Sequence, residues 1–238
     1  MCGIVGYVGT PGQSKPALGV VIDALRRMEY RGYDSAGIAL LDGSGGMAVE
    51  KKAGKLDNLV ATVESAGLEN YPATTGIGHT RWATHGRPTD INAHPHVDQL
   101  GKIAVVHNGI IENFAPLHAE LEAQGVEFTS ETDTETVTHL LHAEYYGEGP
   151  NAGNFTASVM AVINRLEGAF TLVIAHADHP DMLMACRRST PLVIGVGEHQ
   201  MFLGSDVAAF IEHTREAVEL GQDNVVTITA DGYTITDF

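Results

Sequence analysis

The first part of the chain alternates between two periodicities of apolar residues. Residues 3–9 (GIVGYVG) form a short apolar run typical of a strand, and residues 17–30 (ALGVVIDALRRMEY) place apolar side chains on one helix face. Residues 35–42 and 47–54 flank a glycine-rich segment, DGSGG, which predicts a β-hairpin. A second helix is expected over residues 56–66.

Two later segments begin as apolar strands and end in polar residues. They are residues 75–86 (TGIGHTRWATHG) and residues 102–112 (KIAVVHNGIIE). Binding and catalytic residues concentrate in loops that are positioned by such strand ends. We therefore expect most of the chemistry of this protein to come from these two segments.

The rest of the chain predicts helices first and strands afterwards. Helical spacing recurs over residues 114–124, 134–146 and 155–166. Thr132 and Asp133 are candidates to cap the middle helix. From Ala169 onward, short β-rich runs are bounded by Gly, Pro and Asp, and the last hairpin is expected to turn at Asp231-Gly232. No repeat or proline-rich linker divides the chain, so we expect one domain with both strands and helices.

The amino-acid composition is that of a folded, acidic protein. Hydrophobic residues make up 44% of the 238 residues and charged residues 18%, which is too apolar for a disordered chain. Lys and Arg number 14 against 30 Asp and Glu, a formal net charge of −16. Such a charge repels phosphate backbones and anionic lipid surfaces, so neither nucleic acid nor membrane is an expected partner.

The sequence contains no recognisable targeting or membrane-spanning segment. The N-terminus has no basic region followed by a signal-peptide core, and no run approaches the length of a membrane span. We therefore expect a cytoplasmic protein. Its two cysteines, Cys2 and Cys186, should be free thiols in a reducing compartment.

Cys2 is a candidate nucleophile because of its position. If Met1 is removed, the thiol and a free α-amine belong to one residue, and both groups titrate at about pH 8 to 8.5, so proton transfer between them is nearly balanced. Gly3 leaves room for a reacting carbonyl to approach the backbone. Position alone also fits an incidental buried cysteine, since free Cys is among the most buried residue types.

Six motifs occur in a characteristic order: CGIVGYVG, EYRGYDSAGIA, HTRWATHG, NAHPH, VVHNGIIEN and SETDTE. On these motifs the chain resembles the N-terminal glutaminase domain of the glucosamine-6-phosphate synthase family, the isomerising glutamine–fructose-6-phosphate aminotransferases. The Cys2 opening is also similar to that of amidophosphoribosyltransferase, asparagine synthetase and glutamate synthase. YRGYDSAG and HTRWATHG resemble the glucosamine-6-phosphate synthase version.

The resemblance implies an oxyanion hole at Asn108 and Gly109. The Asn108 side chain and a backbone N–H of this pair would donate to the oxygen that becomes negative when a Cys2 thiolate attacks an amide. One such donor is worth about 3 to 4 kcal/mol in the transition state. Taken alone, an Asn-Gly pair is more often a tight hairpin turn.

The resemblance also assigns the groups that bind the substrate. Arg81 matches the family residue that binds the α-carboxylate of glutamine, with Thr84 and His85 as further polar contacts, and Asp133 matches the partner of the α-ammonium. A planar cation and a carboxylate suit these two charges. Taken alone, Arg81 could form a surface ion pair and Asp133 could cap a helix.

A lid and a supporting residue are implied in the same way. The family's loop corresponding to Arg81–Thr89, which includes Trp82, closes over glutamine and helps to exclude water, although an isolated Trp is more often a core residue. Arg31 in YRGYDSAG matches a family residue near the nucleophile, to which we assign a supporting role.

Several other candidates are set aside. His94, His96 and His107 lack metal-binding spacing, and the two imidazoles of His94-Pro95-His96 should point to opposite sides of an extended segment. We therefore expect no metal and no cofactor. Cys186, within MLMACRR, is interpreted as a core residue of a strand.

The fold that the resemblance implies is the N-terminal nucleophile hydrolase fold, an α+β αββα sandwich of two stacked antiparallel sheets. Residues 2–238 would form the glutaminase domain. The expected substrate is L-glutamine, and the reaction makes glutamate and ammonia. The sugar-phosphate isomerase domain that would use the ammonia to convert fructose 6-phosphate into glucosamine 6-phosphate is missing from this chain. The family's full-length enzyme is expected to be a homo-oligomer.

Two other functions stay open from the sequence. The chain could be the glutaminase of a different amidotransferase, which the ammonia acceptor of the full-length protein would decide. It could also be a non-catalytic domain that senses glutamine or binds a partner, if Met1 stays attached and blocks the α-amine.

Overall fold

Two antiparallel sheets form the centre of the molecule, which is a computed structural model that describes residues 2–83 and 86–238. The first sheet has the strand order β11-β9-β10-β1-β4-β2-β3. Its strands are β1 (Gly3–Gly9), β2 (Ser35–Leu41), β3 (Met47–Ala53), β4 (Thr75–Arg81), β9 (Val193–Gly197), β10 (Gln200–Gly204) and β11 (Glu216–Glu219).

The second sheet has the order β13-β12-β8-β7-β6-β5. Its strands are β5 (His96–Val97), β6 (Ile103–Ile111), β7 (Gly168–His176), β8 (Met182–Arg188), β12 (Asn224–Thr229) and β13 (Gly232–Asp237). Every neighbouring pair in both sheets is antiparallel.

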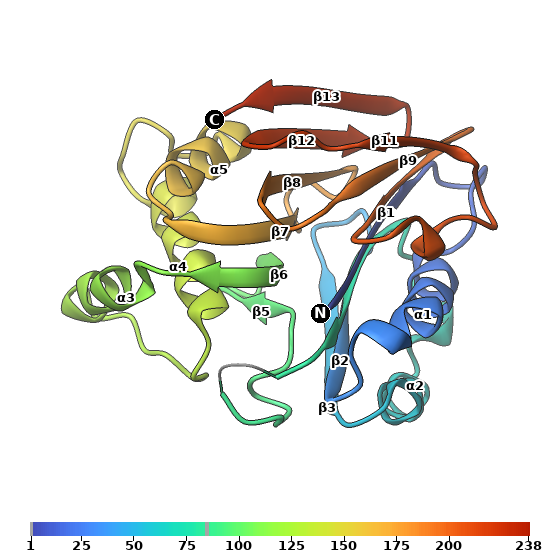
Figure 1. Cartoon of the computed structure of the whole chain (residues 1–238), viewed down its shortest axis with the longest axis horizontal. Coiled ribbons are helices and arrows are strands. Elements are labelled where there is room, and N and C mark those ends of the chain that lie inside the picture. Colours follow the sequence, from blue (N-terminus) through green and yellow to red (C-terminus); the bar gives the residue numbers. More distant parts are fainter. Residues whose placement is uncertain (1, 84–85) are drawn as a thin grey trace.

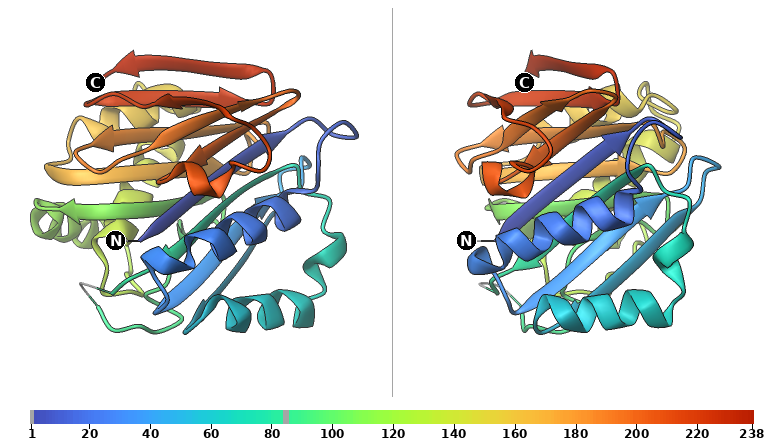
Figure 2. Two further views of the ribbon diagram at one scale, coloured as in Figure 1. Left: turned by 45° about the vertical axis from the view of Figure 1, so that its right-hand side comes forward. Right: turned by 90° about the vertical axis from the view of Figure 1, so that its right-hand side faces the viewer.

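Helices cover the outer face of each sheet (Figure 1). The helices are α1 (Ala17–Met28), α2 (Leu56–Ser65), α3 (Phe114–Ala123), α4 (Asp133–Tyr146) and α5 (Phe155–Ile163). Figure 2 shows α1 and α2 lying across the first sheet. The other three pack on the side of the second sheet, so the layers run helix, sheet, sheet, helix. This arrangement confirms the predicted sandwich.

Side chains of β1 point alternately to the two faces of the first sheet, and both faces are buried. Ile4 and Val8 belong to the apolar cluster between the two sheets, whereas Val5 and Tyr7 belong to the cluster under α1 and α2. Burying each side chain of this size stabilises the fold by roughly 1.5 to 3 kcal/mol. A strand that is covered on both faces has a continuous apolar sequence, and GIVGYVG is such a sequence.

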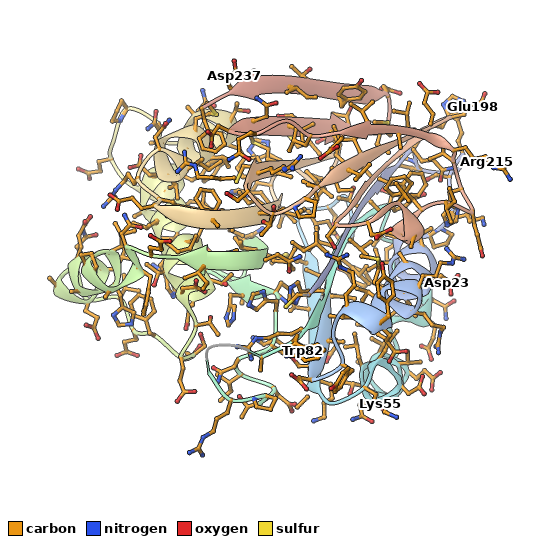
Figure 3. All side chains as sticks on the ribbon, in the orientation of Figure 1. Asp23, Lys55, Trp82, Glu198, Arg215 and Asp237 are labelled. Carbon is orange, nitrogen blue, oxygen red and sulfur yellow. The ribbon has the colours of Figure 1, made fainter. Side chains whose placement is uncertain are left out.

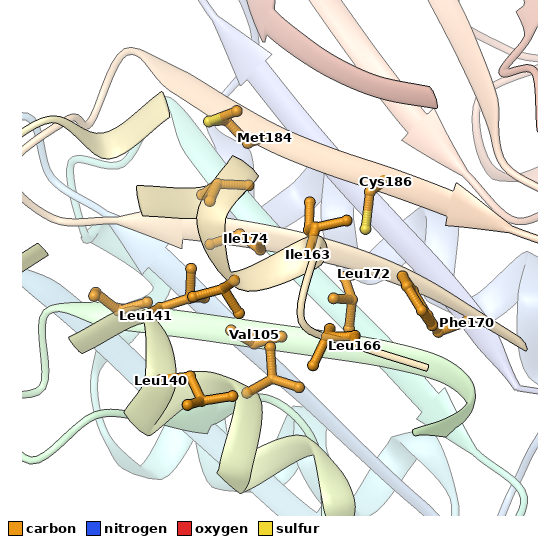
Figure 4. Close-up of a cluster of buried hydrophobic side chains, with 14 of the residues drawn as sticks. Val105, Leu140, Leu141, Ile163, Leu166, Phe170, Leu172, Ile174, Met184 and Cys186 are labelled. Carbon is orange, nitrogen blue, oxygen red and sulfur yellow. The ribbon is translucent and has the colours of Figure 1, made fainter. Parts of the chain in front are cut away.

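The third cluster lies between the second sheet and its helices, and it includes Cys186 of β8 (Figure 4). Cys186 is fully buried beside Leu172 and Ile163, and burial raises the pKa of its thiol to about 12. Its interpretation as a core residue is confirmed.

The ends of some elements differ from the predictions. The helix expected to reach Tyr30 ends at Met28 and continues as a 3₁₀ turn, Glu29–Arg31, and two further 3₁₀ turns span Leu68–Asn70 and Val207–Ala209. The last hairpin turns at Ala230-Asp231, one residue earlier than expected, because Gly232 already pairs with Thr229.

None of the helices in the described ranges has the length and apolar character needed to cross a bilayer.

Candidate active site

Cys2 immediately precedes β1 and is held by residues from three separate elements. Its Sγ accepts a hydrogen bond from the backbone N–H of Trp82 at 3.1 Å. Its carbonyl oxygen accepts bonds from Arg31 Nε at 3.1 Å and from Asn108 Nδ2 at 3.0 Å. The residues before β1, after β4 and within β6 therefore meet at this one position.

The next residue, Gly3, lets β1 come this close to its neighbours. It pairs with Thr80 of β4, and a Cβ atom added to it would lie 2.6 Å from Thr80 Oγ1 and 2.9 Å from Met28 Cβ. Real Cβ atoms do not approach other atoms so closely. The glycine therefore fixes the distance between Cys2 and the end of β4.

A cavity of about 320 Å³ opens at Cys2. Its lining comes from both sheets, the start of α4 and the segment after β8: Cys2, Arg31, His79, Arg81, Trp82, His94, His107, Asn108, Gly109, Ile110, Thr132, Asp133, Thr190 and Pro191. All of the site residues predicted from the sequence are among them, except Thr84 and His85, which lie outside the described residues.

The environment keeps Cys2 protonated at rest. Burial raises the pKa of its thiol, while the N–H of Trp82 and the positive charges of Arg81 and Arg31 oppose that rise. The reactive form of cysteine is the thiolate. Attack by this sulfur therefore requires a proton acceptor close to it.

Asn108 and Gly109 lie inside β6 and not in a turn. The expectation that the polar residues of this segment follow the strand in a loop is wrong for this pair, and so is the alternative of a hairpin turn, because the pairing of β6 with β7 continues to Ile111 and Gly168. Gly109 has a φ of +121°, and a Cβ atom there would lie 2.0 Å from the Ala169 carbonyl oxygen. Only glycine fits this backbone, so the unusual conformation next to Asn108 is built into the sequence.

Two of the side chains that line the cavity carry opposite charges, Arg81 a positive one and Asp133 a negative one. Arg81 ends β4, is only 5% exposed, and its Nη1 donates to the Arg87 carbonyl at 3.4 Å. Asp133 begins α4, and its Oδ2 accepts a bond from the Ile111 N–H at 2.9 Å. A carboxylate in the first turn is also favoured by the helix dipole.

Asp133 is ionised at neutral pH. Burial alone would raise the pKa of its carboxyl, but hydrogen bonds from His107, the Ile111 N–H and Thr134 outweigh that effect and lower the pKa to about 2. The helix does not use Asp133 as its N-cap residue. Thr132 occupies that place, without a side-chain capping bond.

Trp82 and Arg31 both line the cavity. The side chain of Trp82, labelled in Figure 3, is 46% exposed, and its ring packs edge-on against Tyr33 with the ring centroids 5.4 Å apart. It is thus not a core residue. Arg31 also contacts Asp206, with Nη1 3.7 Å from Oδ2. Closure of the loop up to Thr89 stays a prediction.

Four histidines are buried in this region: His79, His94 and His107 line the cavity, and His96 lies against His94. The rings of His94 and His96 lie 5.0 Å apart, so the expectation that they point to opposite sides is wrong. The chain bends at His94 and is not extended there, which brings both rings into one cluster. Burial lowers the pKa of His96 to about 3 and that of His94 well below its usual value.

In residues 2–83 and 86–238, no group of three or more His, Cys, Asp or Glu is arranged to hold a metal ion. The buried imidazoles instead bond to hydroxyl, amide and carboxylate groups. His96 Nε2 lies 2.9 Å from Thr132 Oγ1, and His107 Nδ1 lies 3.0 Å from Thr134 Oγ1.

Four lining residues carried no prediction from the sequence: His79, Ile110, Thr190 and Pro191. Thr190 and Pro191 enter from the segment after β8, and the Thr190 hydroxyl bonds to the Asn108 carbonyl at 3.3 Å. No charged residue or cysteine marks that segment. His79 belongs to HTRWATHG, and its spacing two residues before Arg81 on a strand places both on one face, which could have identified it.

Comparison with known proteins agrees with this geometry. The sequence pattern of a glutamine amidotransferase domain matches residues 79–212, more than half of the chain. The chain belongs to the glutamine amidotransferase domain family.

Two similar curated proteins carry the same name. A glutamine–fructose-6-phosphate aminotransferase (isomerising) from Mycolicibacterium smegmatis is 67% identical, over 100% of this chain and 38% of that protein. A protein of the same name from Streptomyces coelicolor is 59% identical, over 100% of this chain and 37% of its own length. This amidotransferase chain thus spans little more than a third of the relatives it matches.

Solved structures support the fold. Glutamine phosphoribosylpyrophosphate amidotransferase from B. subtilis has a TM-score of 0.81 at 23% identity, over 99% of this chain and 49% of that one. At that identity the likeness bears on the fold alone, which is that of the N-terminal nucleophile amidotransferases.

Proposed function

We propose that this chain hydrolyses L-glutamine to glutamate and ammonia through a thioester on Cys2, once Met1 has been removed. One observation carries the proposal. A sulfur, an amide donor, a guanidinium and an ionised carboxylate line a single cavity of about 320 Å³. Membership of the glutamine amidotransferase family supports glutamine as the substrate.

The charges of the cavity suit the two ends of a free amino acid. Arg81 would bind the α-carboxylate through two parallel N–H bonds, and Asp133 would bind the α-ammonium. Thr84 and His85 would add polar contacts. With the α-carbon held at that end, the side-chain amide of glutamine extends toward Cys2, and Trp82 covers the entrance.

The reaction begins with transfer of the thiol proton to the α-amine of Cys2. The sulfur then attacks the amide carbon, and the carbonyl electron pair moves onto oxygen. Asn108 Nδ2 carries two hydrogens, of which one bonds to the Cys2 carbonyl. We assign the second hydrogen, together with the backbone N–H of Gly109, to the developing oxyanion.

Collapse of this intermediate breaks the C–N bond. The α-ammonium of Cys2 returns its proton to the leaving nitrogen, which departs as ammonia, and a thioester between Cys2 and the glutamyl group remains. Water then attacks the thioester with the same amine as base. The sulfur takes back its proton, and glutamate leaves.

The remainder of the proposal concerns the full-length protein. The relatives' name supports a sugar-phosphate isomerase domain that follows residues 2–238 and uses the ammonia to make glucosamine 6-phosphate from fructose 6-phosphate. We further propose a cytoplasmic enzyme that assembles as a homo-oligomer. Neither a cofactor nor a metal is needed for the glutaminase steps.

Release of ammonia by processed and unprocessed protein tests the proposal. Protein made normally and protein made with methionine aminopeptidase inhibited are compared by intact mass and by glutamine hydrolysis. Processed protein is expected to release equal amounts of glutamate and ammonia, and protein that retains Met1 is expected to be inactive. Equal activity of the two forms would rule out the α-amine of Cys2 as the base.

A further inference from the structure

His79 lies directly behind the Asn108 side chain. It belongs to β4, is completely buried, and its Nε2 lies 3.0 Å from Asn108 Oδ1. The opposite edge of the same amide faces Cys2, whose carbonyl oxygen accepts a bond from Nδ2 at 3.0 Å. The amide is thus held between a ring nitrogen and a carbonyl.

The direction of these two bonds is determined by chemistry. A carbonyl oxygen only accepts, so Asn108 must present its NH₂ group to Cys2 and its Oδ1 to His79. Oδ1 in turn only accepts, so His79 Nε2 must carry the hydrogen. If the amide were rotated by half a turn, Oδ1 would face the Cys2 carbonyl and the oxyanion, and two or three oxygens would repel one another.

The surroundings keep His79 as a neutral donor with a fixed ring plane. Burial lowers the pKa of His79 to about 3, so the imidazole has one N–H at neutral pH. Its ring stacks on that of His94, with centroids 4.4 Å apart and planes 24° from parallel. His94 is itself fixed, because its Nδ1 accepts the backbone N–H of His107 at 3.2 Å.

We propose that His79 is a positioning residue for glutamine hydrolysis: its Nε2–H holds Asn108 Oδ1 so that the second amide hydrogen of Asn108, the one not bonded to the Cys2 carbonyl, points at the reacting carbonyl oxygen. This inference rests on the proposed function, since it gives Asn108 the role of oxyanion donor. His79 itself exchanges no proton with the substrate. Its effect should therefore appear in turnover and not in glutamine binding.

Two substitutions separate the hydrogen bond from the packing of the ring. His79→Leu removes the donor and fills its place with an apolar side chain. His79→Gln keeps an N–H donor, because the amide nitrogen of Gln is as many bonds from Cβ as Nε2 of His. His176→Leu is the matched control, because His176 is also a completely buried strand histidine, with its ring bonded to the Asp178 N–H and outside the cavity lining.

The expected result is a fall in kcat with little change in KM. We expect His79→Leu to lower kcat by about 10- to 100-fold, less than full removal of the donor, with KM for glutamine changed by less than about threefold. His79→Gln should recover most of this loss, and His176→Leu should leave kcat unchanged. A folded His79→Leu protein with normal kcat would overturn the proposal.

A double-mutant cycle shows whether His79 acts through Asn108. In an Asn108→Ala background, His79→Leu should change kcat by less than about twofold, because the group it positions is gone. A further fall as large as in the wild type would overturn the proposal. If Asn108→Ala alone leaves kcat unchanged, the proposed function of Asn108 fails instead, so the two failures are distinguishable.

A measurement on the unaltered protein does not depend on how the variants fold. In protein labelled with ¹⁵N-histidine, the nitrogen signals of His79 report which ring nitrogen carries the hydrogen. The proposal requires Nε2–H at neutral pH. A hydrogen on Nδ1 alone would overturn it.

Discussion

The backbone N–H of Trp82 donates a hydrogen bond to Cys2 Sγ over 3.1 Å. This contact is a consequence of strand register, because Gly3 pairs with Thr80 and the residues that flank the two strands are brought together. An N–H aimed at sulfur favours the thiolate. The sulfur and the guanidinium of Arg81 are thus positioned by one strand end, which ties the proposed nucleophile to the group proposed to bind the α-carboxylate.

The two cysteines should differ sharply in reactivity. Cys186 is fully buried and its pKa is raised to about 12, whereas Cys2 lines the cavity. Brief treatment of native protein with iodoacetamide should modify Cys2 at least about 100-fold faster than Cys186, because alkylation needs an accessible thiolate. Peptide mapping by mass spectrometry measures both rates. Similar rates would show that the apolar cluster between the second sheet and its helices opens readily.

Arg81 and Asn108 should affect different kinetic constants. Arg81→Ala removes the proposed contact with the α-carboxylate, which would be present before and during the reaction, so mainly KM for glutamine should rise. Asn108→Ala removes a donor that acts on the oxyanion, so kcat should fall by about 10²- to 10³-fold. Steady-state glutaminase assays measure the changes in KM and kcat separately for each variant. The reverse pattern would contradict the assignment of roles.

Asp133 should be required for binding of the α-ammonium. Asp133→Asn keeps the shape of the side chain and removes its charge. Charge-assisted hydrogen bonds are worth about 1.5 to 3 kcal/mol, so KM should rise by roughly 10- to 150-fold with a smaller change in kcat. An unchanged KM would contradict the role of this carboxylate.

The same variant should change the acid stability of the protein. The pKa of Asp133 is lowered from 3.8 to about 2, so its stabilising effect is present above pH 3.8 and is lost as the pH falls toward 2. Over that range the free energy of unfolding of the wild type should fall by about 2 kcal/mol more than that of Asp133→Asn. Urea titrations at several pH values measure the difference. Parallel curves would contradict the lowered pKa.

Gly109 should tolerate no side chain. In Gly109→Ala, the added Cβ would lie 2.0 Å from the Ala169 carbonyl oxygen, in addition to the strain of a φ of +121°. We expect a loss of about 3 kcal/mol in unfolding free energy. Gly101→Ala is the matched control, because Gly101 has a φ of +64° with open space around its Cβ position, and it should cost about 1 kcal/mol. Equal losses would show that the close approach to β7 is relieved easily.

Local patterns predicted the helices well, and long-range pairing accounts for what they could not predict. The helix over residues 56–66 is observed as Leu56–Ser65, since its apolar spacing is a local property. The neighbours of β1 are β4 and β10, and Val5 pairs with Gly204. Such a pairing joins distant residues and depends on how the faces of both strands pack, which no short window of sequence contains.

In the candidate site too, residues within sequence motifs were predicted, whereas residues brought in by the tertiary fold were not. The motifs pointed to Cys2, Arg81, Asn108 and Asp133, and all four line one cavity. The error over the ring of His94 arose because an extended chain was assumed where the chain bends. Thr190 was not predicted because it approaches Asn108 from a segment without a distinctive residue pattern, so its place depends on the tertiary fold.

Detection of the glutamyl thioester tests the central claim most directly. Processed protein is mixed with glutamine, quenched rapidly in acid and analysed by intact mass and peptide mapping. We predict a covalent adduct of one glutamyl group on Cys2, removable by hydroxylamine and absent from Cys2→Ala, which should also release no ammonia. Hydrolysis of glutamine by Cys2→Ala at the wild-type rate, or an adduct on another residue, would contradict the account.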